Sequence, residues 1–142
     1  MRHVQLPRPD GSRVLVVEGH GDTLELNTTV LALRGAEVRS AESGEAALEM
    51  LDRWWPNALL TDLGLPGMSA FELAERASTC LRSHQSHGPL PVVATCADAR
   101  PRVRESALER GFRECLTKPY DTDELCDAVA RALGRDRTQR PS

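Results

Sequence analysis

The chain has 142 residues, of which 40% are hydrophobic and 27% are charged, and its formal net charge is -3. This length and composition are typical of one globular domain. The net negative charge argues against the broadly basic surface of a nucleic-acid-binding protein, and no apolar run approaches the roughly 18 residues of a membrane span. Because the first residues also lack the apolar core of a signal peptide, we expect a cytoplasmic protein.

The chain begins with an irregular segment, which is followed by a first strand. Residues 1–12 contain two prolines, an Asp-Gly pair and no hydrophobic periodicity, so we expect a flexible N-terminal arm. The run RVLVVE, residues 13–18, is rich in β-branched side chains and predicts a strand that is covered on both faces. Glu18 ends this strand, and Gly19 breaks the pattern.

A helix is predicted after this strand. Asp22 or Thr23 can accept hydrogen bonds from its first turn and would cap it. The helix would run to about Arg34, with Gly35 at its C-terminal end. The apolar residues that recur at helical spacing, and that we expect to face the core, are Leu26, Val30 and Leu33.

The rest of the chain repeats this alternation four times. The predicted strands cover residues 36–41, 57–62, 90–96 and 113–117. The predicted helices begin at Ser43, at Ser69, at residue 100 and at about Asp121. The last helix has the clearest apolar stripe, formed by Leu125, Ala128, Val129, Ala132 and Leu133. Residues 135–142 offer no apolar side chain to a core, so we expect a disordered tail or linker there.

Strict alternation of strands and helices predicts a parallel sheet with helices on both faces. In such sheets the working site lies at the carboxyl ends of the strands. The residues at those ends are Glu18, Asp62, Cys96 and Lys118. Carboxylates suit a hard cation such as Mg²⁺, a lysine can bind an anion such as a phosphoryl group, and an aspartate can be the nucleophile that accepts it. The alternative is a buried structural ion pair between Asp62 and Lys118, which requires no chemistry.

Several segments of the chain match a known family in order and in spacing. They are RVLVVE, SAESGEAALEML, LLTDLGLPGMSAFEL, LPVVATCADA and LTKPYDTDEL. On these segments, residues 13–134 resemble the receiver domain of two-component response regulators. The resemblance implies a flavodoxin-like (CheY-like) three-layer α/β/α fold, with a five-stranded parallel sheet in the order 2-1-3-4-5.

The resemblance also implies a role for each site residue. Asp62 matches the aspartate that accepts a phosphoryl group from a histidine kinase or a phosphotransfer protein. Lys118 matches the lysine that contacts this group, and the peptide bond before Pro119 is expected to be cis. Glu18, Asp62 and the backbone carbonyl of Gly64 match positions around the family's Mg²⁺ ion.

Three positions depart from the family pattern. Gly19 stands where the family has a second acid that binds Mg²⁺ directly, so we expect weakened Mg²⁺ binding, for which Glu18 or Asp22 would have to compensate. Cys96 replaces the Thr or Ser that contacts the phosphoryl group, and a thiol is a weak hydrogen-bond donor. Cys115 replaces the aromatic switch residue, so the usual rotation of a Tyr or Phe side chain cannot occur.

Two functions are therefore open from the sequence. The chain is either an atypical receiver domain that takes a phosphoryl group on Asp62, or a pseudo-receiver that binds a protein partner without phosphorylation. A less favoured alternative is a redox switch between Cys96 and Cys115, since two small buried thiols that fill space are the simpler interpretation.

The expected partners follow from the resemblance as well. A histidine kinase or phosphotransfer protein would approach Asp62, and a further protein partner would bind the face made by the fourth helix, the fifth strand and the fifth helix. We expect no nucleic acid and no membrane as partners of this domain. No cofactor-binding motif is present in the sequence, so we expect no enzyme of another flavodoxin-like type.

Overall fold

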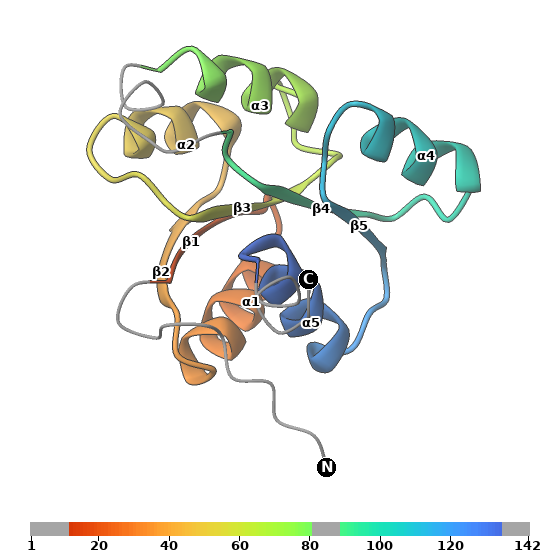
Figure 1. Cartoon of the computed structure of the whole chain (residues 1–142), viewed down its shortest axis with the longest axis horizontal. Helices are drawn as coiled ribbons and strands as arrows, with labels where there is room; N and C mark the ends of the chain where they lie inside the picture. Colours follow the sequence, from red (N-terminus) through yellow and green to blue (C-terminus); the bar gives the residue numbers. More distant parts are fainter. Residues whose placement is uncertain (1–11, 81–88, 135–142) are drawn as a thin grey trace, which may run out of the picture.

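The chain forms a three-layer α/β/α domain (Figure 1). The computed structural model describes residues 12–80 and 89–134. Their strands are β1 (Arg13–Val17), β2 (Glu37–Ala41), β3 (Ala58–Asp62), β4 (Val92–Cys96) and β5 (Glu114–Thr117). Their helices are α1 (Gly21–Leu33), α2 (Gly44–Leu51), α3 (Ala70–Ser78), α4 (Pro101–Glu109) and α5 (Thr122–Ala132). Residues 1–11 of the predicted arm and all of the predicted tail, 135–142, lie outside the described residues.

All neighbouring strands of the sheet are parallel, and their order is β2-β1-β3-β4-β5. The predicted fold and strand order are therefore confirmed. Helices α1 and α5 cover one face of the sheet, and α2, α3 and α4 cover the other (Figure 1). Because β3 lies at the centre of the sheet, its last residue, Asp62, stands at the middle of the carboxyl edge.

Strand β1 shows why this sheet has a core on each face. Successive side chains of a strand point to opposite faces, so Leu15 and Val17 pack with α2 and α3 while Val14 and Val16 pack with α1 and α5. All four side chains are at most 1% exposed. Each buried aliphatic side chain of this size contributes about 1.5–3 kcal/mol relative to exposure. Both faces of the strand must therefore be apolar, as the β-branched run predicted.

Most helix ends follow their local signals. Three predicted helix starts are confirmed. Each of these residues caps its helix by accepting a hydrogen bond from the backbone N–H three residues later: Ser43, Ser69 and Asp121. Gly35 follows α1 with a φ of 106°, a conformation that favours glycine. The predicted cap of α1 was wrong. His20 is the residue before this helix and makes no side-chain cap, whereas Asp22 lies inside the first turn.

The inward face of α1 also differs from the predicted one. Its buried residues are Leu24, Asn27 and Leu31. Leu26 is 55% exposed and Leu33 is 80% exposed, so the prediction that these two face the core was wrong. Val30 is half-buried and packs against the core, as predicted. Leucines lie all around this helix, so spacing alone does not select a face. Contact with β2 and α5 selects the face that carries Leu24 and Leu31.

The last helix has the predicted amphipathic character. Its buried residues include four of the five in the predicted stripe: Leu125, Ala128, Val129 and Ala132. On its outer side, Arg131 forms an ion pair with Glu114 at 3.0 Å. Within the described ranges, no helix is both long and apolar enough to cross a membrane.

Candidate functional site

Three charged side chains meet at the carboxyl edge of the sheet. Asp62 ends β3, Glu18 follows β1, and Lys118 follows β5. The Lys118 Nζ lies 3.3 Å from Asp62 Oδ2 and 3.4 Å from Glu18 Oε1. Glu18 is 2% exposed and the side chain of Asp62 is 15% exposed. Carboxylates this deeply buried need a cationic partner, and Lys118 supplies it to both.

Each carboxylate uses its second oxygen for a backbone hydrogen bond. The N–H of His20 donates to Glu18 Oε2 at 3.2 Å, and the N–H of Gly64 donates to Asp62 Oδ1 at 3.0 Å. These contacts fix both carboxylate planes. The peptide bond between Lys118 and Pro119 is cis.

Lys118 is the only lysine in the sequence; the other seventeen long-chain cations are arginines. Burial alone lowers the pKa of Lys118, but the negative charges of Asp62 and Glu18 outweigh burial and raise it. The ammonium group is therefore charged at neutral pH. An ammonium on a flexible stem is a point charge that can turn toward an incoming anion.

The oxygen atoms at this edge are of the kind that Mg²⁺ accepts. Mg²⁺ is commonly bound by one or two carboxylates and keeps several waters, and the carboxylates of Glu18 and Asp62 lie at this edge. These possible metal ligands are few. The described residues contain no group of three or more His, Cys, Asp and Glu side chains that could hold a metal. Asp22 is exposed in the first turn of α1. The residues present thus fit a weak cation site with two carboxylates.

Gly19 leaves room for a β-carbon, the atom from which a side chain would begin. A Cβ atom added there would have as its nearest contact Pro66 Cδ at 3.5 Å, which is an ordinary van der Waals distance. The glycine is therefore not required by close packing. Its effect on the site is chemical, because one potential oxygen ligand is missing next to Glu18.

The two cysteines at altered family positions lie against each other. Cys96 ends β4 and Cys115 lies in β5, both are buried, and their Sγ atoms are 3.9 Å apart. The Cys96 thiol also lies 3.3 Å from the backbone carbonyl of Asp98, to which it donates. Burial, followed by the neighbouring Cys96, raises the pKa of Cys115 to about 12. A thiol that stays protonated at neutral pH is a poor nucleophile.

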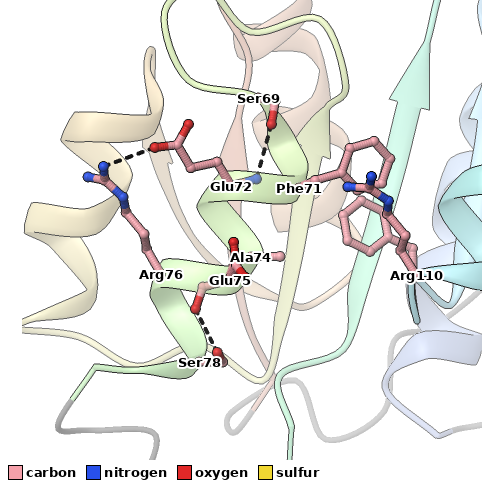
Figure 2. A pocket seen from close by; sticks show the side chains of 9 residues that line it. Ser69, Phe71, Glu72, Ala74, Glu75, Arg76, Ser78 and Arg110 are labelled. Atoms are coloured by element: carbon pink, nitrogen blue, oxygen red, sulfur yellow. Dashed lines mark hydrogen bonds and ion pairs between the residues drawn. The ribbon is translucent and has the colours of Figure 1, made fainter.

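A separate hollow of about 760 Å³ runs along α3 and includes none of these residues. Figure 2 shows Arg110 beside Phe71 at one end of it, and the ion pair between Glu72 and Arg76 at the other. The rings of Phe71 and Phe112 stack with centroids 5.1 Å apart, and the Arg110 guanidinium lies 4.3 Å from the Phe71 centroid. Its lining combines acids, arginines and aromatic rings, so it has no single charge character.

Comparison with known proteins decides the family. Residues 14–130 match the family model described as the response regulator receiver domain. The chain belongs to this family. Receiver domains are modules of two-component signalling, in which they interact with histidine kinases or phosphotransfer proteins. Of the receiver positions, the structure brings Glu18, Asp62 and Lys118 together at one edge.

The relatives of this receiver domain differ in size. An uncharacterized 14.6 kDa protein of Leptolyngbya boryana is 38% identical over 116 residues, which cover 82% of this chain and 86% of that protein. The regulatory protein AtoC of Escherichia coli is 30% identical over 86% of this chain, and the sensor histidine kinase RcsC of Salmonella typhi is 30% identical over 92% of it. This chain spans only 25% of AtoC and 13% of RcsC.

Solved structures show the same fold. A response regulator receiver domain protein from Clostridium thermocellum has a TM-score of 0.75 at 20% identity, over 91% of this chain and 99% of that one. NtrX from Brucella abortus has a TM-score of 0.77 at 26% identity, over 92% of this chain and 28% of that one. The first of these likenesses concerns the fold alone.

Sequence reasoning missed two polar contacts near this receiver site. The His20 N–H that binds Glu18 could not be foreseen, because a backbone donor has no signature in the sequence. The side-chain amide of Asn27 donates to the hydroxyl of Tyr120 at 3.0 Å. Asn27 stands among apolar residues of α1, and a polar residue on a buried face is a signal that could have been noticed.

Proposed function

We propose that this receiver domain accepts a phosphoryl group on Asp62 from a histidine kinase or a histidine phosphotransfer protein. The proposal rests on one distance: the Lys118 Nζ lies 3.3 Å from Asp62 Oδ2 at the carboxyl edge of the sheet. The side chain of Asp62 is 15% exposed, so a donor's phosphoryl group can reach it from solvent. Membership of the receiver family supports the same roles for these two residues.

In the proposed transfer, a carboxylate oxygen of Asp62 attacks the phosphorus atom. The new oxygen–phosphorus bond forms as the phosphorus–nitrogen bond of the donor's phosphohistidine breaks, and the imidazole nitrogen keeps the electron pair and takes up a proton. Lys118 would then turn its ammonium from Asp62 to a phosphoryl oxygen. The Gly64 N–H, 3.0 Å from Asp62 Oδ1, would hold the carboxylate in the attacking orientation.

The metal requirement of this site is proposed to be unusual. Mg²⁺, when bound, neutralises charge on the phosphoryl oxygens during transfer. Glu18, Asp62 and the Gly64 carbonyl would hold it, without the carboxylate that Gly19 lacks. We therefore expect phosphorylation to require more Mg²⁺ than in receiver domains that have two acids after the first strand.

The test is phosphorylation with a small donor. The purified chain is incubated with acetyl phosphate over a series of MgCl₂ concentrations, and its intact mass is recorded beside an Asp62→Asn control. A gain of one phosphoryl group that is absent in the control supports the proposal. No gain at saturating Mg²⁺, in a chain that is folded by circular dichroism, would overturn it.

A second candidate is a pseudo-receiver that works by protein binding alone. The missing carboxylate at Gly19 favours it, as does the engagement of both remaining carboxylates by Lys118. Its proposed contact face is α4, β5 and α5, where the arginines of α4 such as Arg102 and Arg104 are exposed. This candidate predicts that partner binding is the same for the wild-type chain and for Asp62→Asn, with no phosphorylation of either.

A further inference from the structure

A buried amide on α1 reaches the loop that follows Lys118. Asn27 is 2% exposed and lies on the inward face of α1, between Leu24 and Leu31. Its Nδ2 donates to the Tyr120 hydroxyl oxygen at 3.0 Å. A buried polar group that loses its partner costs about 1–3 kcal/mol. An aliphatic side chain would fill this position without that risk, so the hydrogen bond itself is the feature to explain.

The loop between β5 and α5 is anchored at three points. The backbone N–H of Lys118 donates to the carbonyl of Cys96 at 2.8 Å. Tyr120, two residues later, accepts the hydrogen bond of Asn27. Asp121 then caps α5, because its carboxylate accepts from the Glu124 N–H at 2.7 Å and its own N–H donates to the Glu124 carboxylate at 3.0 Å. Of these anchors, only the one at Tyr120 connects the loop to α1.

The charged residues of the site also act on the phenol of Tyr120. Burial raises the pKa of its phenol, the hydrogen bond from Asn27 lowers it, and the charges of Lys118, Glu18 and Asp62 act on it as well. The ring itself packs against the core under α1 and α5. The phenol is therefore held between the core and the charged cluster.

We propose that Tyr120, held by Asn27, is a positioning residue for Lys118. The hydrogen bond fixes the loop against α1, and the loop determines where the Lys118 side chain leaves the end of β5. Since α1 begins three residues after Glu18, the same contact sets the position of Lys118 relative to the Glu18 carboxylate. Tyr120 acts on phosphoryl transfer through Lys118 and not by touching the phosphoryl group. The catalytic part of this inference rests on the proposed function, whereas the positioning of Lys118 does not.

The chain offers an unusually clean probe, because Lys118 is its only lysine and Tyr120 its only tyrosine. The wild-type chain and Tyr120→Phe are labelled with ¹³C-lysine, and NOEs from the Lys118 Hε protons to the side chains of Glu18 and Asp62 are recorded at pH 7. The Lys118 Nζ lies 3.4 Å from Glu18 and 3.3 Å from Asp62, so if Tyr120 positions Lys118, these NOEs weaken or vanish in the variant. Unchanged NOEs in a folded variant would overturn the inference.

Two companion variants separate positioning from general stability. Tyr120→Phe leaves the Asn27 amide without a partner, so it also destabilises the fold. The double variant Asn27→Leu, Tyr120→Phe removes both polar groups and should recover stability in urea unfolding, because a matched apolar pair replaces the hydrogen bond. If Tyr120 were merely structural, the double variant would also recover the wild-type NOEs between Lys118 and the two carboxylate side chains; we expect that it does not.

Phosphorylation provides the second readout. We expect the rate with acetyl phosphate to fall about ten-fold or more in Tyr120→Phe and in the double variant, because small misplacements of a catalytic group can cost up to about a hundred-fold. A wild-type rate in the double variant would contradict a role in transfer. If the wild-type chain takes no phosphoryl group, the proposed function fails, and the NOEs of Lys118 still decide whether Tyr120 positions it.

Discussion

The ammonium nitrogen of Lys118 lies 3.4 Å from Glu18 Oε1, although the two residues are 100 positions apart in the sequence. Glu18 is 2% exposed, and burying a carboxylate without a charged partner is costly. Lys118 also lies 3.3 Å from Asp62 Oδ2, so the sole lysine of the chain balances both acids of the site.

Removal of the ammonium should destabilise the fold. In Lys118→Met, Glu18 and Asp62 face each other without a cation, and we expect a loss of about 3 kcal/mol in the free energy of unfolding at pH 7. Lys118→Arg is the charged control, because it keeps a cation beside both carboxylates, and it should lose much less. Urea unfolding of the two variants at pH 7 is the measurement. An equal loss from both variants would show that the packing of the lysine stem, and not its charge, is what matters.

High pH should weaken the native chain through the same residue. The pKa of Lys118 in the folded state is raised above its ordinary value of 10.5, so its stabilisation is fully present below that pH and is lost as the pH rises through the folded-state pKa. In Lys118→Arg the guanidinium stays charged over this range. The stability of the wild type relative to this variant should therefore decline above about pH 10.5. Parallel stability profiles would exclude Lys118 as the titrating group.

A carboxylate restored at position 19 should tighten Mg²⁺ binding. A Cβ at Gly19 would lie 3.5 Å from Pro66 Cδ, so an aspartate can be accommodated. We expect Gly19→Asp to bind Mg²⁺ at least about ten-fold more tightly than the wild type, which corresponds to about 1.4 kcal/mol. Gly19→Asn is the matched control, since it has the same shape without the charge. Calorimetric titration that gives equal affinities for the Asp and Asn variants would contradict the prediction.

Two leucines of α1 test the observed helix orientation. Leu31 is 0% exposed and Leu33 is 80% exposed, although the apolar spacing placed Leu33 inward. Leu31→Ala should cost about 2–5 kcal/mol, as for other buried leucines, whereas Leu33→Ala should stay within about 0.5 kcal/mol of the wild type. Chemical unfolding of the two variants makes the comparison. A larger loss from Leu33→Ala would mean that the helix is rotated.

The buried thiols should resist oxidation. Cys96 and Cys115 have Sγ atoms 3.9 Å apart, yet burial and the neighbouring Cys96 raise the pKa of Cys115 to about 12. Because the thiolate is the reactive form, we expect little disulfide formation with diamide at neutral pH in the native chain. Peptide mapping, with Cys96→Ser as the control, is the measurement. Rapid formation of a Cys96–Cys115 disulfide that is absent in the control would instead support a redox switch.

The sequence alone determined the alternation of elements, the starts of three helices and the edge at which the site lies. These follow from local physics: β-branched runs form buried strands, Ser43, Ser69 and Asp121 satisfy exposed backbone N–H groups, and parallel strands bring their carboxyl ends to one edge. The resemblance to receiver domains added the strand order, which is confirmed.

Only the tertiary structure decided which face of α1 is buried and which carboxylates form ion pairs with Lys118. Leucines lie on several sides of α1, so the fit against β2 and α5, and not the helical period, selects Leu31 over Leu33. The contact between Asn27 and Tyr120 joins residues 93 positions apart. Long-range hydrogen bonds of this kind depend on the distance between packed elements, and no local pattern in the sequence encodes that distance.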